Sequence, residues 1–354
     1  MKQTYVGLQV LRFAAAMLVA VMHITQAISI HLTGRGEGVY WGTGAVGVDI
    51  FFVISGFVMA ISTAGWAGPS EAWVFARRRI QRIVPLYWVY TLLKAALIAA
   101  VPALAVKSSV VPLHLAASLA FVPMTAPWGL VQPVLPVGWT LNFEMLFYAV
   151  FGLAIAARLP RIATCLAGFA LLFIAAQFLP GVTALHFYAQ SIIFEFIVGV
   201  AFAQALLRWG PGPVLAGALL LLAGTLFTFG LGWDPDSDRF FPWGVGAAAI
   251  VLGTLWLEPV IVRMPLARPL AFLGDASYSI YLSHTFVVPA VVMVLKRLHL
   301  GQPLLAFVLA SAAVMLAGAA SYLWLEKPLI AGARRLLFKP RAPRFPHAAN
   351  PASK

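Results

Sequence analysis

Ten apolar stretches, each roughly 17 to 25 residues long, follow one another along the chain and constrain the fold more than any other feature. Hydrocarbon offers the backbone no hydrogen-bond partners, so such stretches span a membrane as helices. The chain is 62% hydrophobic and 10% charged, and its mean hydropathy is +0.93, which is more apolar surface than a soluble protein can bury. The sequence therefore predicts an all-α, polytopic membrane helix bundle of about ten transmembrane helices. The predicted spans are 6–29, 44–64, 80–101, 138–157, 162–179, 188–207, 213–232, 241–257, 276–295 and 303–325.

The predicted transmembrane domain covers residues 1–335. Residues 108–124 are apolar but short and lie beside several prolines, so we expect a re-entrant or interfacial segment there rather than an eleventh span. Residues 336–354 are basic, and we expect them to form a disordered cytoplasmic tail that touches anionic lipid. We expect the first apolar stretch to be retained, because Arg12 interrupts it and no convincing cleavage site follows.

The basic residues predict how the bundle lies in the membrane. With the amino terminus inside, 17 of the 24 Lys and Arg residues fall on the inner side and 5 on the outer side. Cytoplasmic loops of membrane proteins carry an excess of Lys and Arg, so we expect both termini in the cytoplasm. The same bias explains the net charge of +13 without a nucleic-acid partner, and we expect none.

Arg12 and His23 are the most informative polar residues, because ionisable groups are costly in hydrocarbon and tend to be functional there. Eleven residues of α-helix turn about 20° past three full revolutions, so both side chains leave the first span on one face. They lie about 16.5 Å apart along the helix axis, with Arg12 near the inner surface and His23 about two-thirds of the way across. One face thus offers an anion-binding group and a titratable base, although His23 alone could be a packing histidine.

Three carboxylates are predicted to share the layer of His23. Asp49, Glu144 and Glu195 each follow the predicted outer start of a span by a few residues, about 8–10 Å below the outer surface. This arrangement predicts an enclosed polar chamber. A carboxylate there could orient the imidazole and raise its basicity, as a general base needs, but spacing does not identify which one. His284 lies near the middle of its span and is expected either to line the same cavity or to pack.

Arg79 and Arg82, at the inner end of the third span, are three residues apart and therefore neighbours on one helix face. Together with Arg12, their guanidinium groups could clamp phosphates. Basic residues that flank a span also act as orientation signals and lipid anchors, which is the structural alternative. The position of Arg12 deeper in its span favours the binding role.

The other polar residues also have structural alternatives. Asp49 could cap or pair structurally, Glu195 could pair elsewhere in the bundle, and Glu326 is expected to pair with a loop arginine. We expect the glycine of "SGF", Gly56, to allow a close approach of two helices. No metal site is predicted.

Six stretches of the sequence together resemble the acyltransferase-3 family of bacterial integral-membrane acyltransferases. They are "LQVLRFAAAMLVAVMH" (8–23), "GVDIFFVISGFVM" (47–59), "RRRIQRIVPLYW" (77–88), "GWTLNFEMLFY" (138–148), "GDASYSIYLSHTF" (274–286) and "WLEKP" (324–328). The resemblance covers residues 5–330, and the form is most similar to the exopolysaccharide O-acetyltransferases. It implies that residues 1–335 form a transmembrane acyltransferase domain in the bacterial inner membrane.

The resemblance also implies an activity and assigns roles to particular residues. The family moves an acyl group, usually acetyl from acetyl-CoA, onto a carbohydrate hydroxyl. Its arginine and histidine of the first span correspond to Arg12 and His23, its paired arginines to Arg79 and Arg82, and its fourth-span glutamate to Glu144. Acyl-CoA is then a donor substrate rather than a permanently bound cofactor. The acceptor is a carbohydrate, free or lipid-linked, and membrane lipids surround the bundle.

Geometry and resemblance together predict a mechanism. Arg12, Arg79 and Arg82 would hold the phosphates of acetyl-CoA, and the slender pantetheine arm would cover the distance of about 16.5 Å to His23. His23 would act as the general base, with Glu144 or Asp49 orienting it. A two-step route through an acetylated residue stays open. The alternative function is a transporter or flippase of a lipid-linked glycan, because intramembrane charges also line transport paths.

Overall fold

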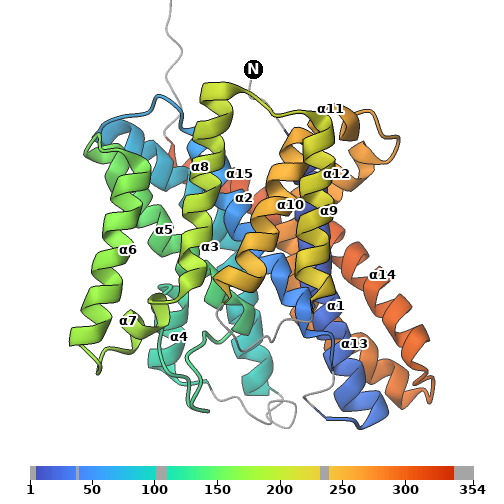
Figure 1. Ribbon diagram of the computed structural model, residues 1–354. Helices are drawn as coiled ribbons and strands as arrows, with labels where there is room; N and C mark the ends of the chain where they lie inside the picture. The colour runs from blue at the N-terminus through green and yellow to red at the C-terminus, as the bar shows by residue number, and fades with distance from the viewer. Residues whose placement is uncertain (1–4, 37–39, 101–109, 232–238, 339–354) are drawn as a thin grey trace, which may run out of the picture.

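A computed structural model describes residues 5–36, 40–100, 110–231 and 239–338, and these ranges form a bundle of long helices (Figure 1). Within them there is no β-strand, only an isolated bridge between Thr125 and Val131. The predicted all-α bundle is therefore confirmed. Most of the predicted tail, residues 339–354, lies outside the described residues, and the last helix reaches two residues into it.

The first half of the chain runs from α1 to α7, and the short helix α4 lies in the connection between α3 and α5. Its helices are α1 (Val6–Ile28) with a π-helical turn η1 (Ser29–Thr33), η2 (Gly42–Ala45), α2 (Val46–Ser62), α3 (Pro69–Ala100), α4 (Pro112–Leu119), η4 (Pro136–Gly138), α5 (Trp139–Ala156), α6 (Arg161–Phe178) and α7 (Thr183–Tyr188).

The second half completes the bundle and ends in a helix at one of its ends. Its helices are η5 (Ser191–Ile193), α8 (Phe194–Trp209), α9 (Val214–Gly230), η6 (Phe240–Gly244), α10 (Val245–Trp256), α11 (Glu258–Ile261), α12 (Ala267–Asp275), α13 (Ser277–Arg297), α14 (Pro303–Ser321), η7 (Tyr322–Glu326) and α15 (Lys327–Leu337).

Each of the ten predicted spans corresponds to a helix or to consecutive helical segments. Eight are at least 18 residues long and apolar enough to cross a membrane. The other two, α9 and the η6–α10 stretch, are shorter apolar helices at the lower end of the usual span length. Large apolar side chains such as Leu171, Leu215 and Leu316 stay exposed on the outside of the bundle, where lipid would surround them. The chain is an integral membrane protein.

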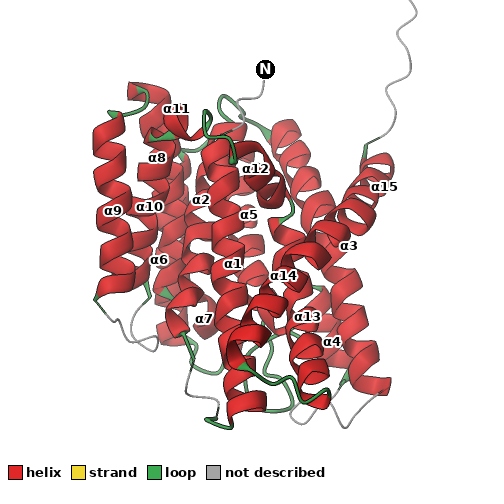
Figure 2. Cartoon of the chain, turned by 90° about the vertical axis from the view of Figure 1, so that its right-hand side faces the viewer, coloured by secondary structure: helices red, strands yellow, loops and turns green. Residues whose placement is uncertain are grey.

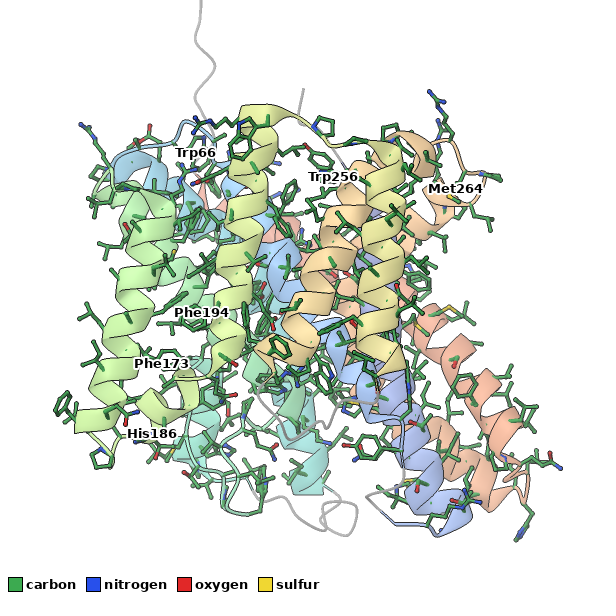
Figure 3. The ribbon with its side chains drawn as sticks, in the orientation of Figure 1. Trp66, Phe173, His186, Phe194, Trp256 and Met264 are labelled. Atoms are coloured by element: carbon green, nitrogen blue, oxygen red, sulfur yellow. The ribbon has the colours of Figure 1, made fainter. Side chains whose placement is uncertain are left out.

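Small residues allow α2 and α8 to cross closely. A β-carbon on Gly56 of α2 would collide with the Phe196 carbonyl, and one on Gly199 of α8 would collide with the Val53 carbonyl. The absence of side chains at both glycines lets the two backbones touch, as in many membrane bundles. The expected role of Gly56 is confirmed. Farther out, α6 is joined to α8 by the stacked rings of Phe173 and Phe194, 5.7 Å apart (Figure 3).

Helix α4 is the apolar segment for which we predicted no crossing. It has eight residues, about 12 Å of helix, which is too short to span the hydrocarbon. Tyr87 and Trp88 of α3 donate hydrogen bonds to the carbonyls of Ser118 and Leu119 at its end. The chain from α4 to α5 is thus held against α3, and α5 begins among buried residues: Val137, just before it, is 5% exposed.

The ends of the described chain lie at the same end of the bundle. Figure 2 shows α11, α12 and α15 there, whereas α4 and α7 lie toward the opposite end. Glu258 of α11 fixes the start of α1 by accepting hydrogen bonds from the backbone N–H groups of Val6 and Gly7, at 2.6 and 2.7 Å. A carboxylate on the first free N–H groups of a helix also complements its dipole. The start of α1, and with it the position of Arg12, is therefore tied to the α11 end.

Candidate active site

Arg12 and Arg82 face one cavity inside the bundle. The cavity has a volume of about 90 Å³, and its lining residues are Arg12, Val48, Phe51, Phe52, Arg82, Ile83, Thr140, Leu141, Glu144, Tyr148, Ser277, Tyr278 and Tyr281. We call it the arginine cavity. Arg12 donates to the side chain of Gln9 at 3.1 Å, and within the described residues Arg82 donates no hydrogen bond. Both guanidinium groups thus keep donors for an anion.

Glu144 lies in this cavity with the two arginines. Its Oε1 atom accepts hydrogen bonds from Ser55 and from Tyr148, each 3.0 Å long. Tyr148 follows Glu144 by one helical turn on α5, and Ser55 reaches it from α2. The hydroxyl groups fix the carboxylate while the arginines balance its charge, which is the arrangement a buried charge requires.

Arg79 lies beside this group but does not line the cavity. Its guanidinium group is 5.9 Å from the ring centroid of Tyr148 and 5.6 Å from that of Phe75. Of the two arginines predicted to be neighbours on α3, Arg82 therefore reaches the cavity directly, and Arg79 packs behind Tyr148.

A second, larger pocket opens on the other side of Arg82. It has a volume of about 400 Å³ and is lined by Arg82, Asp275, Tyr322, Glu326, Lys327, Ile330, Ala331, Arg334 and Arg335. We call it the α15 pocket. Glu326, expected to pair with a loop arginine, instead accepts a hydrogen bond from Ser279 at 2.7 Å and faces this pocket.

His23 contacts a second histidine. His284 of α13 is fully buried, and its Nε2 atom lies 3.3 Å from Nδ1 of His23, with the ring centroids 5.0 Å apart. The same Nδ1 atom lies 3.0 Å from the Val19 carbonyl, and Nδ1 of His284 lies 3.3 Å from the Ile280 carbonyl. His23 and His284 thus form a pair between α1 and α13.

The hydrogen-bond partners assign the tautomers of this pair. A carbonyl only accepts, so Nδ1 carries the proton in both rings. Nε2 of His284 is then an acceptor for the shared N–H of His23. Nε2 of His23 keeps its lone pair and has no hydrogen-bond partner among the described residues. This is the atom that can accept a proton.

Tyr281 separates the histidine pair from the arginine cavity. Its ring lies 5.8 Å from that of His284 on one side, and its hydroxyl lines the cavity with Thr140, 3.1 Å away. Phe51 of α2 meets the Tyr281 ring edge-on at 6.2 Å and lines the cavity too. Among the described residues His23 does not line the cavity, whereas Phe51 and Tyr281 line it and also pack toward the α1–α13 side.

The predicted layer of carboxylates around His23 is wrong. Neither Glu144 nor Asp49 makes a hydrogen bond to His23; within the described residues the imidazole that orients it belongs to His284. The error lies in counting depth from the starts of the spans. Helix α5 starts inside the bundle, so Glu144 reaches the level of Arg12 instead of His23.

Asp49 has a different partner, which the sequence did not suggest. Its carboxylate is fully buried and forms an ion pair of 2.6 Å with Arg239, which also donates to the Ala45 carbonyl. The Arg239 guanidinium lies 4.6 Å from the ring centroid of Trp243. The charge distribution predicts Arg239 among the five basic residues on the outer side. Gly44 of η2 lies against Leu18 and Met22 of α1, and Gly47 at the start of α2 lies against Ala15 and Val19. Asp49 comes two residues after Gly47, so it lies farther along α1 toward Arg12 and away from His23.

Glu195 also lies away from the histidine pair. It is fully buried in the first turn of α8 and packs against Gly244, where η6 meets α10. The prediction that it lines the chamber with His284 is therefore wrong for Glu195, whereas His284 touches His23 directly. Thr140, Tyr148 and Tyr281 are site residues that sequence reasoning missed, and only Tyr148, four residues from Glu144 on one helix, gave a signal.

Comparison with known proteins fits this arrangement. The family model described as "Acyltransferase domain", acyltransferase-3, matches residues 5–324. The chain is 37% identical over 302 residues to "Exopolysaccharide production protein ExoZ" of Rhizobium meliloti (strain 1021), covering 83% of this chain and 92% of that protein. It is 27% identical over 310 residues to "Acyltransferase MdmB" of Streptomyces mycarofaciens, covering 78% and 77%. No solved structure matches. The chain therefore belongs to the acyltransferase-3 family and is an acyltransferase.

Proposed function

We propose that this protein transfers an acetyl group from acetyl-CoA to a hydroxyl of an exopolysaccharide sugar, free or lipid-linked, in the bacterial inner membrane. The observation that carries the proposal is that the site has two parts, an anion-binding cavity and a histidine pair. An arginine-lined cavity faces the end that holds α15, and a histidine with a free ring nitrogen lies beyond it. The printed name of ExoZ associates that relative with exopolysaccharide production, which supports the choice of acceptor.

The donor would enter from the end of the bundle that holds α15. Acetyl-CoA is anionic and is made in the cytoplasm, and the basic residues predict that this end is cytoplasmic. Arg12 and Arg82 keep donors for an anion, and Glu144 holds them at the cavity by charge. Arg79, behind Tyr148, adds to the positive potential without touching the donor.

The chemical step uses His23 as the general base. Nε2 of His23 removes the proton from the sugar hydroxyl while the hydroxyl oxygen attacks the carbonyl carbon of the thioester. The carbon–sulfur bond breaks, and the coenzyme thiolate takes the proton from His23, which returns to its neutral form. The products are the acetyl ester and free coenzyme. Nε2 of His284 accepts a hydrogen bond from the Nδ1–H group of His23 throughout and supports the imidazolium that forms between the two transfers.

The Phe51–Tyr281 contact must open for this reaction. We infer that the two rings separate the arginine cavity from the histidine pair, so the acetyl-bearing arm has to displace one of them as it enters. The proposal thus includes a conformational step, and lid motions of this kind limit the rate of many enzymes.

Coenzyme release tests the proposal. The purified protein in lipid nanodiscs is mixed with radiolabelled acetyl-CoA and with polysaccharide or lipid-linked repeat units from cells that lack the protein. We expect free thiol to appear only when the acceptor is present, and the label to move into the glycan in equal amount. Glycan crossing a vesicle membrane with no thiol released would contradict the transferase and support a flippase.

Substitution of His284 tests the pairing of the two histidines. We expect His284→Leu to lower kcat about tenfold, because His23 loses one hydrogen-bond acceptor worth about 1.4 kcal/mol. His284→Gln should recover part of the rate, since its side-chain oxygen can accept the same N–H. Both variants should bind acetyl-CoA as the wild-type protein does. Equal losses in the two variants, or a loss in binding alone, would show that His284 only fills space.

A further inference from the structure

We propose that the α15 pocket binds the phosphorylated nucleotide of acyl-CoA, with Lys327, Arg334 and Arg335 holding its phosphates. This inference rests on the proposed use of acyl-CoA and adds a binding site for the part of the donor that the arginine cavity is too small to hold. The pocket is the larger of the two, at about 400 Å³ against about 90 Å³. A nucleotide with its diphosphate and 3′-phosphate is a bulky, strongly anionic group.

The spacing of the basic residues on α15 points to a ligand. The α15 residues that line the pocket are Lys327, Ile330, Ala331, Arg334 and Arg335, which follow one another by three or four positions or are adjacent. Such positions form a single face of a helix. All three basic side chains are exposed, so they stand in solvent around the pocket and can move onto an anion.

The helix is held in place by other residues. Arg77 of α3 donates a hydrogen bond of 2.8 Å to the Leu337 carbonyl at the end of α15, and its guanidinium lies 5.7 Å from the ring centroid of Phe338. Leu329 packs against the main hydrophobic core. These contacts attach α15 to the bundle without using the basic face, which therefore stays available.

The charges of the pocket match an anionic ligand. Four cationic side chains and two carboxylates line it, which leaves a positive balance. Glu326 is engaged by the Ser279 hydroxyl at 2.7 Å, so one of the two carboxylates is already held by the protein. The cations that remain can form charge-assisted hydrogen bonds to phosphate oxygens.

Arg82 connects this pocket to the reaction site. It lines both the α15 pocket and the arginine cavity. A nucleotide held at α15 would therefore direct the pantetheine arm past Arg82 and Arg12 toward the histidine pair. The distance of about 16.5 Å from Arg12 to His23 along α1 suits a thin arm with the thioester at its tip. This division gives each part of the donor its own site.

The experiment measures binding of the donor and of its parts. The full chain is placed in phosphatidylcholine nanodiscs, and radiolabelled acetyl-CoA is displaced by acetyl-3′-dephospho-CoA or by acetyl-pantetheine, which lacks the nucleotide. We expect the Arg334→Gln/Arg335→Gln variant to bind acetyl-CoA about 10- to 100-fold more weakly than the wild type. Its affinity for acetyl-pantetheine should be unchanged, which also shows that the variant is folded.

A matched control uses two arginines at the same end of the bundle. Arg263 and Arg268 are exposed and do not line the pocket, so Arg263→Gln/Arg268→Gln removes the same charge and should bind acetyl-CoA as the wild type does. An equal loss in this control would overturn the proposal, because general surface charge would then explain the effect. Wild-type affinity in the α15 variant would overturn it as well.

Further results separate this inference from the proposed function. If the wild type binds acetyl-CoA and Arg82→Gln weakens that binding, while the α15 variant binds it normally, the donor is correct and the nucleotide site is wrong. If the wild type binds no acetyl-CoA, both proposals fall.

The phosphates of a lipid headgroup share the same chemistry. Retention of phosphatidylglycerol by the wild type and not by the α15 variant, with equal acetyl-CoA binding, would assign the pocket to lipid and overturn the proposal.

Discussion

His23→Gln should lower kcat by about 10²- to 10⁴-fold, which is the contribution of a general base. Glutamine is close to histidine in size and can still donate to the Val19 carbonyl, so the helix should keep its packing. It cannot take a proton from a sugar hydroxyl. The measurement is the rate of acetyl transfer per enzyme at saturating acetyl-CoA and acceptor, with the purified protein in nanodiscs.

Two controls show whether this loss concerns the proton. A base works in its deprotonated form, so the wild-type rate should rise with pH as the imidazole loses its proton, and the variant should lack that rise. Acetyl-CoA should bind to the variant as tightly as to the wild type, whereas Arg12→Gln should weaken binding instead. A His23→Gln protein with a wild-type rate would remove the base from the mechanism.

Asp49→Asn should lower the free energy of unfolding by about 3 kcal/mol, because it leaves the positive charge of Arg239 without its buried partner. The ion pair is short, at 2.6 Å, and its carboxylate is fully buried, although the arginine is 21% exposed. That exposure lets water reach Arg239 and places the expected loss at the low end of the range for buried pairs. Reversible unfolding in mixed detergent micelles provides the measurement.

The double variant Asp49→Asn/Arg239→Gln is the matched control. It removes both charges, so it should be more stable than Asp49→Asn alone, and the cycle of single and double variants gives the coupling between the two side chains. A double variant that loses the sum of the two single losses would show that the pair contributes nothing beyond its separate groups. Trp243, which packs on Arg239, stays unchanged in every variant.

The helical fold could be predicted from the sequence because hydrocarbon leaves a chain few choices. Long apolar runs mark the helices whatever their tertiary contacts, and all ten are found as helices or as consecutive helical segments. The approach of α2 to α8 at Gly56 was also readable, since a missing side chain matters only where two backbones meet. The meeting of Arg12 and Arg82 in one cavity follows from their place near the same surface.

The depth of each polar side chain inside the bundle could not be predicted, because the level at which a helix begins depends on how the helices pack. Helix α1 continues through a π-helical turn to Thr33, whereas α5 begins next to buried Val137. Equal residue counts from the two starts therefore reach different levels, which is why Glu144 joined the arginines instead of His23. The partner of Asp49 was hidden for a related reason: Arg239 follows a polar loop in the sequence, yet it folds back onto α2.

The edge-on contact between the Phe51 and Tyr281 rings bears on how the membrane stays impermeable to ions. A catalyst whose two substrates arrive from opposite faces of a membrane risks becoming a leak for protons and salts. Here two aromatic side chains that line the arginine cavity meet edge-on beside the histidine pair. In the proposed reaction, the arm that displaces them would fill the opening it creates, so the membrane potential would survive each turnover.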